Sequence, residues 1–227
     1  MPQIDTELEH LKVKLMEMWD LVEYQMQSGR EALLNKDQEL ANKIIKLGKK
    51  VNQYDVKIDR QCENFFALFT PVAVDLRIVL AILKINANIE RIGDTAEGIA
   101  MHVERLKAPL NQELVQQTNI LTMYDEALKM LADCRIAFMK NDTEFAKQII
   151  KRDKLLNKIN RQADAIIAKY LRSNIENIEE GLIVLSIIKK LERVGDQVTN
   201  IAEEIIFYQD AKVVKHKTKD KKKKKGE

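Results

Sequence analysis

The sequence predicts an all-α protein made of two tandem, similar three-helix bundles, with six long antiparallel helices. Three observations lead to this prediction: few helix-breaking residues, long stretches with helical periodicity, and one helix pattern that occurs twice. The 227 residues include only 7 Gly and 3 Pro, whereas these two residues together average about 12% of a protein. This scarcity argues against all-β folds, which need frequent turn residues, and against nucleotide-binding α/β folds, which need glycine-rich turns.

Because punctuating residues are few, each one helps to divide the chain. Gly29 and Asn35 separate a first helix from a second, Pro71 ends the second, and Pro109 follows the third. Residues 141–143 have the composition of a turn followed by a helix N-cap. The predicted helices span about residues 4–28, 36–69, 72–106, 111–140, 143–172 and 176–209.

The third and sixth predicted helices repeat each other. Both place apolar residues at steps of three and four over more than three heptads. The segment Glu90–Asp94 (ERIGD) recurs as Glu192–Asp196 (ERVGD), and the second and fifth helices are more weakly alike. The glycines at equivalent places in the two segments, Gly93 and Gly195, predict a close approach of neighbouring helices. The predicted units are two repeats, residues 1–107 and 108–211, followed by a lysine-rich tail, residues 212–227.

Carboxylates run beside the apolar seams of these helices. Residues four apart on a helix lie one turn above each other on one face, and this spacing joins Glu90 to Asp94 and Asp55 to Asp59. In an antiparallel hairpin we expect Asp55 opposite Asp94 and Asp59 opposite Glu90. In the second repeat we expect Asp153 opposite Asp196 and Asn157 opposite Glu192. The candidate metal ligands are Asp55, Asp59, Glu90, Asp94, Asp153, Glu192 and Asp196.

Like charges at this spacing repel one another, so the stripes require compensating cations. Two interpretations stay open. Basic side chains near the stripes, namely Lys57, Arg60, Arg91 and Arg193, would make a salt-bridged surface. Alternatively, the carboxylates would bind metal ions, and an all-oxygen site suits hard cations, iron, manganese or magnesium.

Composition limits the other classes of function. Residues 212–227 hold 9 Lys against two acidic residues, so the remaining 211 residues carry a net charge of −4, and a basic body for nucleic acid is not indicated. The tail is expected to be disordered, with a tether to an anionic membrane or nucleic acid as the alternative. Without a signal peptide or a membrane span, a cytoplasmic location is expected. Cys62 and Cys134 are expected to be buried thiols.

No arrangement for catalysis is recognisable in the sequence. The chain has no GxSxG, HExxH or P-loop pattern. A di-iron enzyme of the ferritin type would need inward-facing Glu-x-x-His motifs on several helices, and only three histidines are present. We therefore expect a protein that is not an enzyme. A carboxylate-bound metal store or metalloenzyme of the helical-bundle type remains the alternative.

The chain resembles the PhoU family of phosphate-signalling accessory proteins. The resemblance covers about residues 5–210 and rests on three features: Pro71–Arg77 (PVAVDLR), the ERIGD helix, and the ERVGD helix with its following Asn200–Glu203 (NIAE). It implies two similar three-helix bundles with E(D)xxxD motifs that carry multinuclear iron or zinc clusters. Asn157 departs from the acidic pattern of these motifs, which weakens the second metal site.

The same resemblance implies a role and a set of partners. The protein would be a cytosolic negative regulator of phosphate uptake and of phosphate-starvation signalling. It would bridge the ATPase subunit of a phosphate ABC transporter and the cytosolic part of a phosphate-sensing histidine kinase. A homodimer is expected, nucleic acid is not an expected partner, and membrane contact is at most peripheral.

Overall fold

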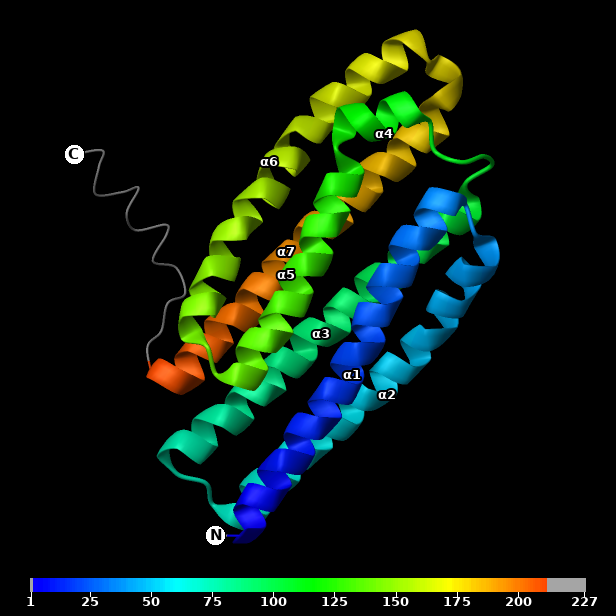
Figure 1. Ribbon diagram of the computed structural model, residues 1–227. Helices are drawn as coiled ribbons and strands as arrows, with labels where there is room; N and C mark the ends of the chain where they lie inside the picture. Colours follow the sequence, from blue (N-terminus) through cyan, green and yellow to red (C-terminus); the bar gives the residue numbers. More distant parts are fainter. Residues whose placement is uncertain (1, 212–227) are drawn as a thin grey trace, which may run out of the picture.

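Residues 2–211 of the computed structural model are described here, and they contain seven α-helices and one short 3-10 helix (Figure 1). The elements are α1 (Pro2–Asn35), α2 (Gln38–Phe69), α3 (Ala73–Arg105), α4 (Gln112–Thr118), α5 (Ile120–Lys140), α6 (Thr143–Ser173), η1 (Ile175–Asn177) and α7 (Ile178–Asp210). The predicted all-α class is confirmed. The lysine-rich tail, residues 212–227, lies outside the described residues, so its predictions stay predictions.

The long helices form two three-helix groups that pack against each other. Helices α1, α2 and α3 make the first group, and α5, α6 and α7 make the second, with α4 lying against α6 (Figure 1). The groups meet mainly where α3 packs along α7. Buried apolar side chains of both groups join into one continuous core. The arrangement fits two three-helix bundles that share a long helix–helix interface.

Two predicted helix boundaries are wrong. Helix α1 does not end at Gly29 but continues to Asn35. An added Cβ at Gly29 would lie 2.7 Å from the Tyr124 hydroxyl oxygen on α5, so this glycine permits a close approach between the two groups. The predicted helix over residues 111–140 is divided at Asn119, whose left-handed backbone (φ 54°) separates α4 from α5. Asparagine tolerates this conformation better than most residues.

Other local predictions are confirmed by the side chains. The Asp142 carboxylate accepts a hydrogen bond of 2.8 Å from the Phe145 amide, which caps the N-terminus of α6. Cys62 and Cys134 are both buried free thiols. Trp19 is fully buried in the core, with its ring 6.3 Å from that of Phe138 on α5. In the described part of the chain, no helix has the length and apolarity that crossing a membrane would require.

Candidate functional site

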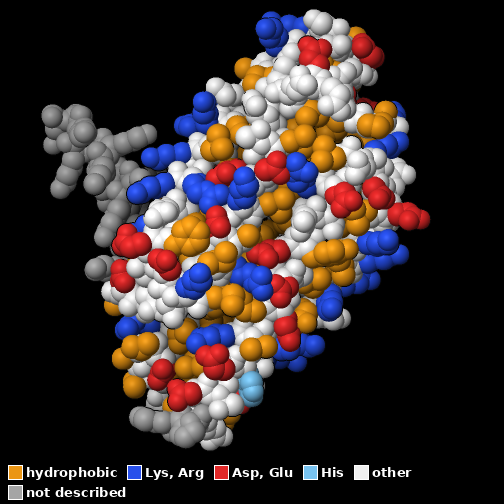
Figure 2. Space-filling view, viewed as in Figure 1, with side chains coloured by type: hydrophobic (Ala, Val, Ile, Leu, Met, Phe, Trp, Pro, Cys, Tyr) orange, Lys and Arg blue, Asp and Glu red, His pale blue; other side chains and the backbone are white. Residues whose placement is uncertain are grey.

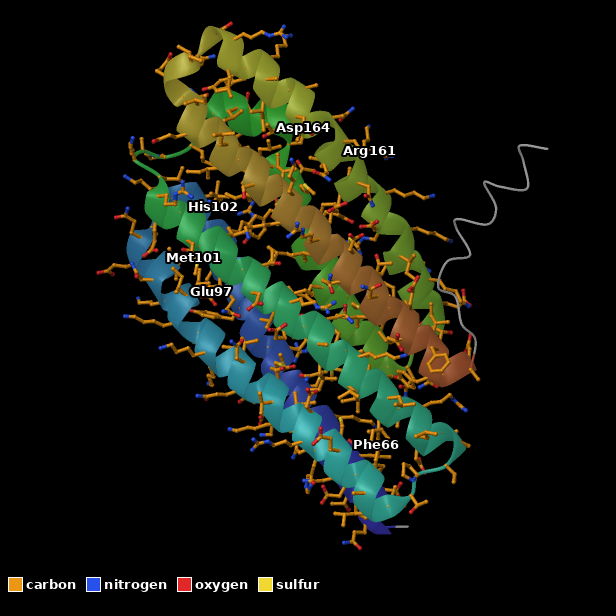
Figure 3. All side chains as sticks on the ribbon, turned by 180° about the vertical axis from the view of Figure 1, so that it is seen from behind. Phe66, Glu97, Met101, His102, Arg161 and Asp164 are labelled. Atoms are coloured by element: carbon orange, nitrogen blue, oxygen red, sulfur yellow. The ribbon has the colours of Figure 1, made fainter. Side chains whose placement is uncertain are left out.

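The candidate ligands lie along two helix–helix contacts on one side of the molecule. Seen from behind, α2, α3, α7 and α6 lie side by side in that order (Figure 3). Asp55 and Asp59 on α2 and Glu90 and Asp94 on α3 lie along the α2–α3 contact, and we call these four residues the first acidic cluster. Along the α6–α7 contact, the second acidic cluster comprises Asp153 of α6 together with Glu192 and Asp196 of α7.

The first acidic cluster is organised by a buried amide that sequence reasoning missed. The Asn86 side chain on α3 is fully buried, and its Nδ2 donates to Asp55 Oδ1 (2.7 Å) and to Asp59 Oδ1 (3.0 Å). Its Oδ1 has no hydrogen-bond partner among the described atoms. Asn86 precedes Glu90 by four residues and therefore continues the i, i+4 stripe of Glu90 and Asp94. This spacing is the sequence signal that could have identified Asn86 as part of the cluster.

The register of the first hairpin differs from the prediction. Asp55 interacts electrostatically with both Glu90 and Asp94, in agreement with its expected neighbour. Asp59, however, contacts Asn86, one helical turn before the expected partner Glu90. Helix α2 continues to Phe69 and α3 begins at Ala73. The centre of the connection between them is therefore earlier in the sequence than the predicted pairing required, and the pairing shifts accordingly.

The second acidic cluster also contains one amide, but this amide comes from the other helix. Asn157 lies one turn after Asp153 on α6, and its Nδ2 donates to the Asp153 carboxylate and to the Asp153 carbonyl oxygen. The residue that corresponds to Asn86 in the repeat is Ile188, which is buried. Each cluster therefore contains an amide that donates to a carboxylate: buried Asn86 donates from α3 to two carboxylates of α2, whereas half-buried Asn157 donates to one carboxylate of its own helix.

Glycines allow the helices that carry the clusters to approach closely, as predicted. A Cβ added to Gly195 of α7 would lie 2.6 Å from Asp153 Oδ1 and 2.7 Å from Leu156 Cδ2 on α6. A Cβ added to Gly93 of α3 would lie 3.1 Å from Val51 Cγ1 on α2. The close approach brings α6 against the part of α7 that carries the carboxylates, and α2 against the corresponding part of α3.

Burial and mutual repulsion disfavour the ionised forms of these carboxylates. Partial burial, followed by the charges of Asp59 and Asp94, raises the pKa of Asp55. Partial burial, followed by the charges of Asp94 and Asp55, raises the pKa of Glu90. The strongest effect is at Asp153, where burial, together with the charges of Asp196 and Glu192, raises the pKa to about 6 from 3.8. Negative charge accumulates in both acidic clusters, which is the electrostatic condition for binding a cation.

Basic side chains do not neutralise the clusters. Among residues 2–211, none of the candidate ligands has a lysine or arginine nitrogen within 4 Å in an ion pair. The nearest basic influence is weak: Arg91 and Arg193, each next in sequence to a cluster glutamate, lower the pKa of Glu90 and Glu192 slightly against the dominant upward effect of burial. The salt-bridged surface is therefore not what the described side chains form.

The oxygen atoms present fit a cation, although they are not yet gathered around one. Two buried acceptors in the clusters, Asn86 Oδ1 and Asp153 Oδ1, have no hydrogen-bond partner. Unpartnered oxygens beside carboxylates of raised pKa are the donor set that a hard cation prefers. No three His, Cys, Asp or Glu side chains within the described residues already stand in a ligating arrangement, so binding would require the carboxylates to turn toward one another.

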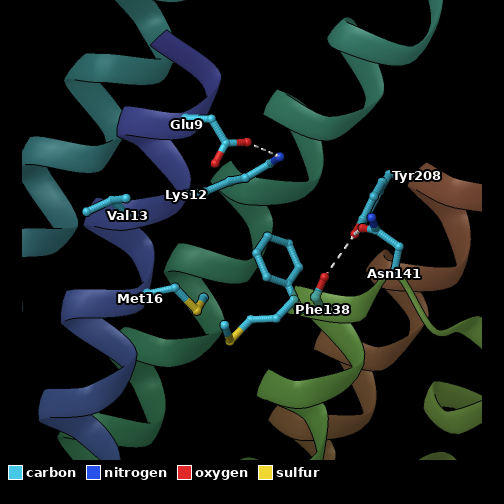
Figure 4. A pocket seen from close by; sticks show the side chains of 8 residues that line it. Glu9, Lys12, Val13, Met16, Phe138, Asn141 and Tyr208 are labelled. Atoms are coloured by element: carbon cyan, nitrogen blue, oxygen red, sulfur yellow. Dashed lines mark hydrogen bonds and ion pairs between the residues drawn. The ribbon is translucent and has the colours of Figure 1, made fainter. Parts of the chain in front are cut away.

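Other candidate sites offer less chemistry. Glu7 and His10 have the Glu-x-x-His spacing, which sequence reasoning overlooked, but their side chains are 45% and 61% exposed on the surface of α1. A cavity of about 310 Å³ between α1, α5 and α7 is lined by Val13, Met16 and Phe138, and the Glu9–Lys12 ion pair lies beside it (Figure 4). On the side that carries α1 and α5, basic and acidic side chains are interspersed (Figure 2).

Comparison with known proteins gives consistent matches along the chain. The sequence profile of the PhoU domain matches residues 15–103 and again residues 120–205. A phosphate-specific transport system accessory protein PhoU homologue from Burkholderia is 32% identical over 94% of this chain and 92% of its own length. The phosphate-specific transport system accessory protein PhoU of Escherichia coli is 31% identical over 94% of this chain and 88% of its own.

Two solved structures share the fold. The phosphate transport system regulatory protein PhoU from Streptococcus pneumoniae superposes with a TM-score of 0.83 at 30% identity, covering 93% of this chain and 99% of that one. PhoU from Pseudomonas aeruginosa superposes with a TM-score of 0.85 at 28% identity, covering 92% and 99%. The match therefore includes both helical groups and the interface between them.

Proposed function

Because the chain belongs to the PhoU family, we propose that it is a regulatory accessory protein of a phosphate-specific transport system. The observation that carries this proposal is the family match in both repeats, together with relatives named for that transport system along nearly their whole length. The proposed role is negative: the protein restrains phosphate uptake and starvation signalling when phosphate is plentiful. It acts by binding other proteins and not by catalysis.

The proposed partners are the ATPase subunit of a phosphate ABC transporter and the cytosolic part of a phosphate-sensing histidine kinase. Helices of more than 30 residues packed into one core give a rigid surface long enough to contact two proteins at once. This role places the protein in the cytoplasm, and a homodimer would present each contact surface twice. The partners are proposed from the family and not from a surface of known shape.

Pull-down experiments with the full chain test the scaffold. The chain is immobilised and offered the ATPase subunit and the kinase fragment separately and then together. The proposal expects each to be retained, and both in one complex when offered together. Failure to retain either protein, with iron or zinc supplied as well as without, would overturn it.

We further propose that the acidic clusters hold metal ions, with iron or zinc as the first candidates. In the first acidic cluster the ligands would be Asp55, Asp59, Glu90 and Asp94, and in the second they would be Asp153, Glu192 and Asp196. A bound cation would supply the positive charge that offsets carboxylate repulsion across each pair of helices. Support comes from the raised carboxyl pKa values, the unpartnered oxygens and the lack of ion pairs described above.

Elemental analysis of protein purified without chelator tests the metal proposal. We expect bound metal in the natural chain and a lower content in the double variant Asp59→Asn with Asp94→Asn. The matched control is Glu63→Gln with Glu104→Gln, which removes two exposed carboxylates from the same two helices and should leave the metal content unchanged. Equal metal content in all three proteins would refute the first site.

A further inference from the structure

A cleft of opposite charge lies between the two acidic clusters. It is formed by α3 and α7, the two central helices of the side seen in Figure 3, and its volume is about 280 Å³. Its lining residues are Arg91, Asp94, Thr95, Lys190, Arg193 and Gln197. Three cations against one carboxylate leave the cleft with a net charge of +2.

Arg91 and Arg193 are exposed and Lys190 is half-buried, and within residues 2–211 no carboxylate side chain pairs with any of them. Half-buried Arg30, Arg135 and Arg152 each form salt bridges with carboxylates. Within residues 2–211, by contrast, the side chains of Arg91, Arg193 and half-buried Lys190 form no ion pair or hydrogen bond. We call these three residues the cleft cations.

The fold holds two of the cleft cations together from different repeats. Arg91 and Arg193 occupy equivalent positions in ERIGD and ERVGD, so the packing of α3 along α7 brings one arginine from each repeat to the same cleft. Lys190 extends from α7 across to α3, where a Cβ added to Gly98 would lie 2.5 Å from its Nζ. The glycine thus provides the space in which the ammonium group rests.

The groups next to the cleft do not neutralise the positive charge of the cleft cations. The Asp94 carboxylate is shared with the first acidic cluster, where its charge raises the pKa of Asp55 and Glu90. Further along α3, His102 faces Ser186, and burial together with the charges of Lys190 and Arg105 lowers the His102 pKa. Gln197 also lines the cleft, and its buried Oε1 has no hydrogen-bond partner among the described residues.

From this geometry we infer that the α3–α7 cleft is a binding site for a phosphate-type oxyanion. Arginine forks bind phosphate oxygens in pairs, and a lysine adds a compact positive charge. A dianion matches the net charge of +2, and the volume is below the usual range for drug-sized ligands, which favours a small ion. The source is either free inorganic phosphate or the phosphoryl group of a nucleotide. The inference goes beyond the proposed function and depends neither on bound metal nor on a protein partner.

Calorimetric titration of the full chain tests this inference. Inorganic phosphate and ADP are titrated separately at pH 7.5, with chloride at matched ionic strength as the reference. We expect saturable binding of at least one of the two ligands. Binding of phosphate identifies free phosphate as the source, whereas binding of ADP alone identifies the nucleotide phosphoryl group. Lack of saturable binding by both would overturn the inference.

Variants locate the site. Arg91→Gln with Arg193→Gln should weaken binding about a hundredfold, about tenfold for each lost charge-assisted contact. The control Arg60→Gln with Arg172→Gln removes the same charge from two exposed arginines outside the cleft and should leave affinity unchanged. Equal affinity in the cleft variant and the natural chain, or an equal loss in the control, would refute the site. Circular dichroism confirms that each variant is folded.

A chelator separates this site from the metal proposal. The titration is repeated on protein as purified and after dialysis against EDTA. We expect phosphate or ADP binding to persist after EDTA, because the cleft cations supply it. Binding that disappears with the metal would show that the anion sits on a metal ion of an acidic cluster, and that result would overturn the inference without touching the proposed scaffold role.

Discussion

Replacing Asp153 with asparagine should stabilise the metal-free protein at neutral pH. Folding raises the pKa of this carboxyl to about 6 from 3.8, so at pH 7.5 the folded state carries an ionised group that its surroundings disfavour. The difference corresponds to about 3 kcal/mol. Because the side chain keeps partial contact with solvent, we expect about 1–2 kcal/mol of it to be realised. In the natural chain Asn157 donates a hydrogen bond to this carboxylate. The side chain introduced by Asp153→Asn keeps one oxygen that can accept the same hydrogen bond.

The predicted gain in stability depends on pH, and the direction of the pKa shift determines how. Since the folded pKa lies above the unfolded value, the destabilisation by Asp153 is fully present above about pH 6 and disappears as the pH falls toward 3.8. The gain from Asp153→Asn should therefore be largest at pH 7.5 and close to zero at pH 4. Urea unfolding followed by circular dichroism in EDTA, at both pH values, measures it.

A control on the same helix makes the test specific. Asp164 on α6 is exposed and forms a weak surface ion pair with Lys189 (3.6 Å), so Asp164→Asn should change stability by no more than about 0.5 kcal/mol at either pH. An Asp153→Asn protein that is less stable at pH 7.5, or one whose gain is the same at both pH values, would refute the electrostatic argument.

Four further substitutions test the glycine contacts, a helix cap and the buried amide, each by urea unfolding at pH 7.5. Gly195→Ala should cost about 1–3 kcal/mol because its Cβ would meet α6, whereas Gly98→Ala should be neutral or stabilising because its Cβ meets only the flexible end of Lys190; equal effects would contradict this. Asp142→Ala should cost about 1 kcal/mol through loss of the α6 cap, and no loss would show that the cap contributes nothing. Asn86→Leu should cost about 2–3 kcal/mol because two carboxylates lose a buried donor; a stabilised protein would refute that role.

The helices were predictable because their apolar residues repeat with the helical period over long stretches. The heptad seams of α3 and α7 extend over more than three heptads, so their positions did not depend on end signals. The break at Gly29 was a wrong prediction because a glycine inside a helix costs only about 1 kcal/mol. Its packing against Tyr124 depends on a tertiary contact that no local pattern contains. The break at Asn119 was missed because asparagine occurs both inside helices and at left-handed positions such as this one.

The candidate site was predictable in composition but not in register. Paired carboxylates at i, i+4 spacing identified the residues, and the repeat identified the same feature twice. The register was uncertain because Pro71 alone does not fix where the connection between α2 and α3 is centred. A shift of one turn then replaced Glu90 with Asn86 as the neighbour of Asp59. An asparagine in an acidic stripe is easily overlooked when only charge is read.

Helices α3 and α7 each border two of the described sites at once. The Asp94 side of α3 borders both the first acidic cluster and the α3–α7 cleft, and α7 borders the cleft and the second acidic cluster. Because α3 and α7 pack along each other in one core, a ligand that moved either helix would act on two of these sites at once. Any such coupling would be reciprocal: each ligand would change the affinity for the other by the same factor.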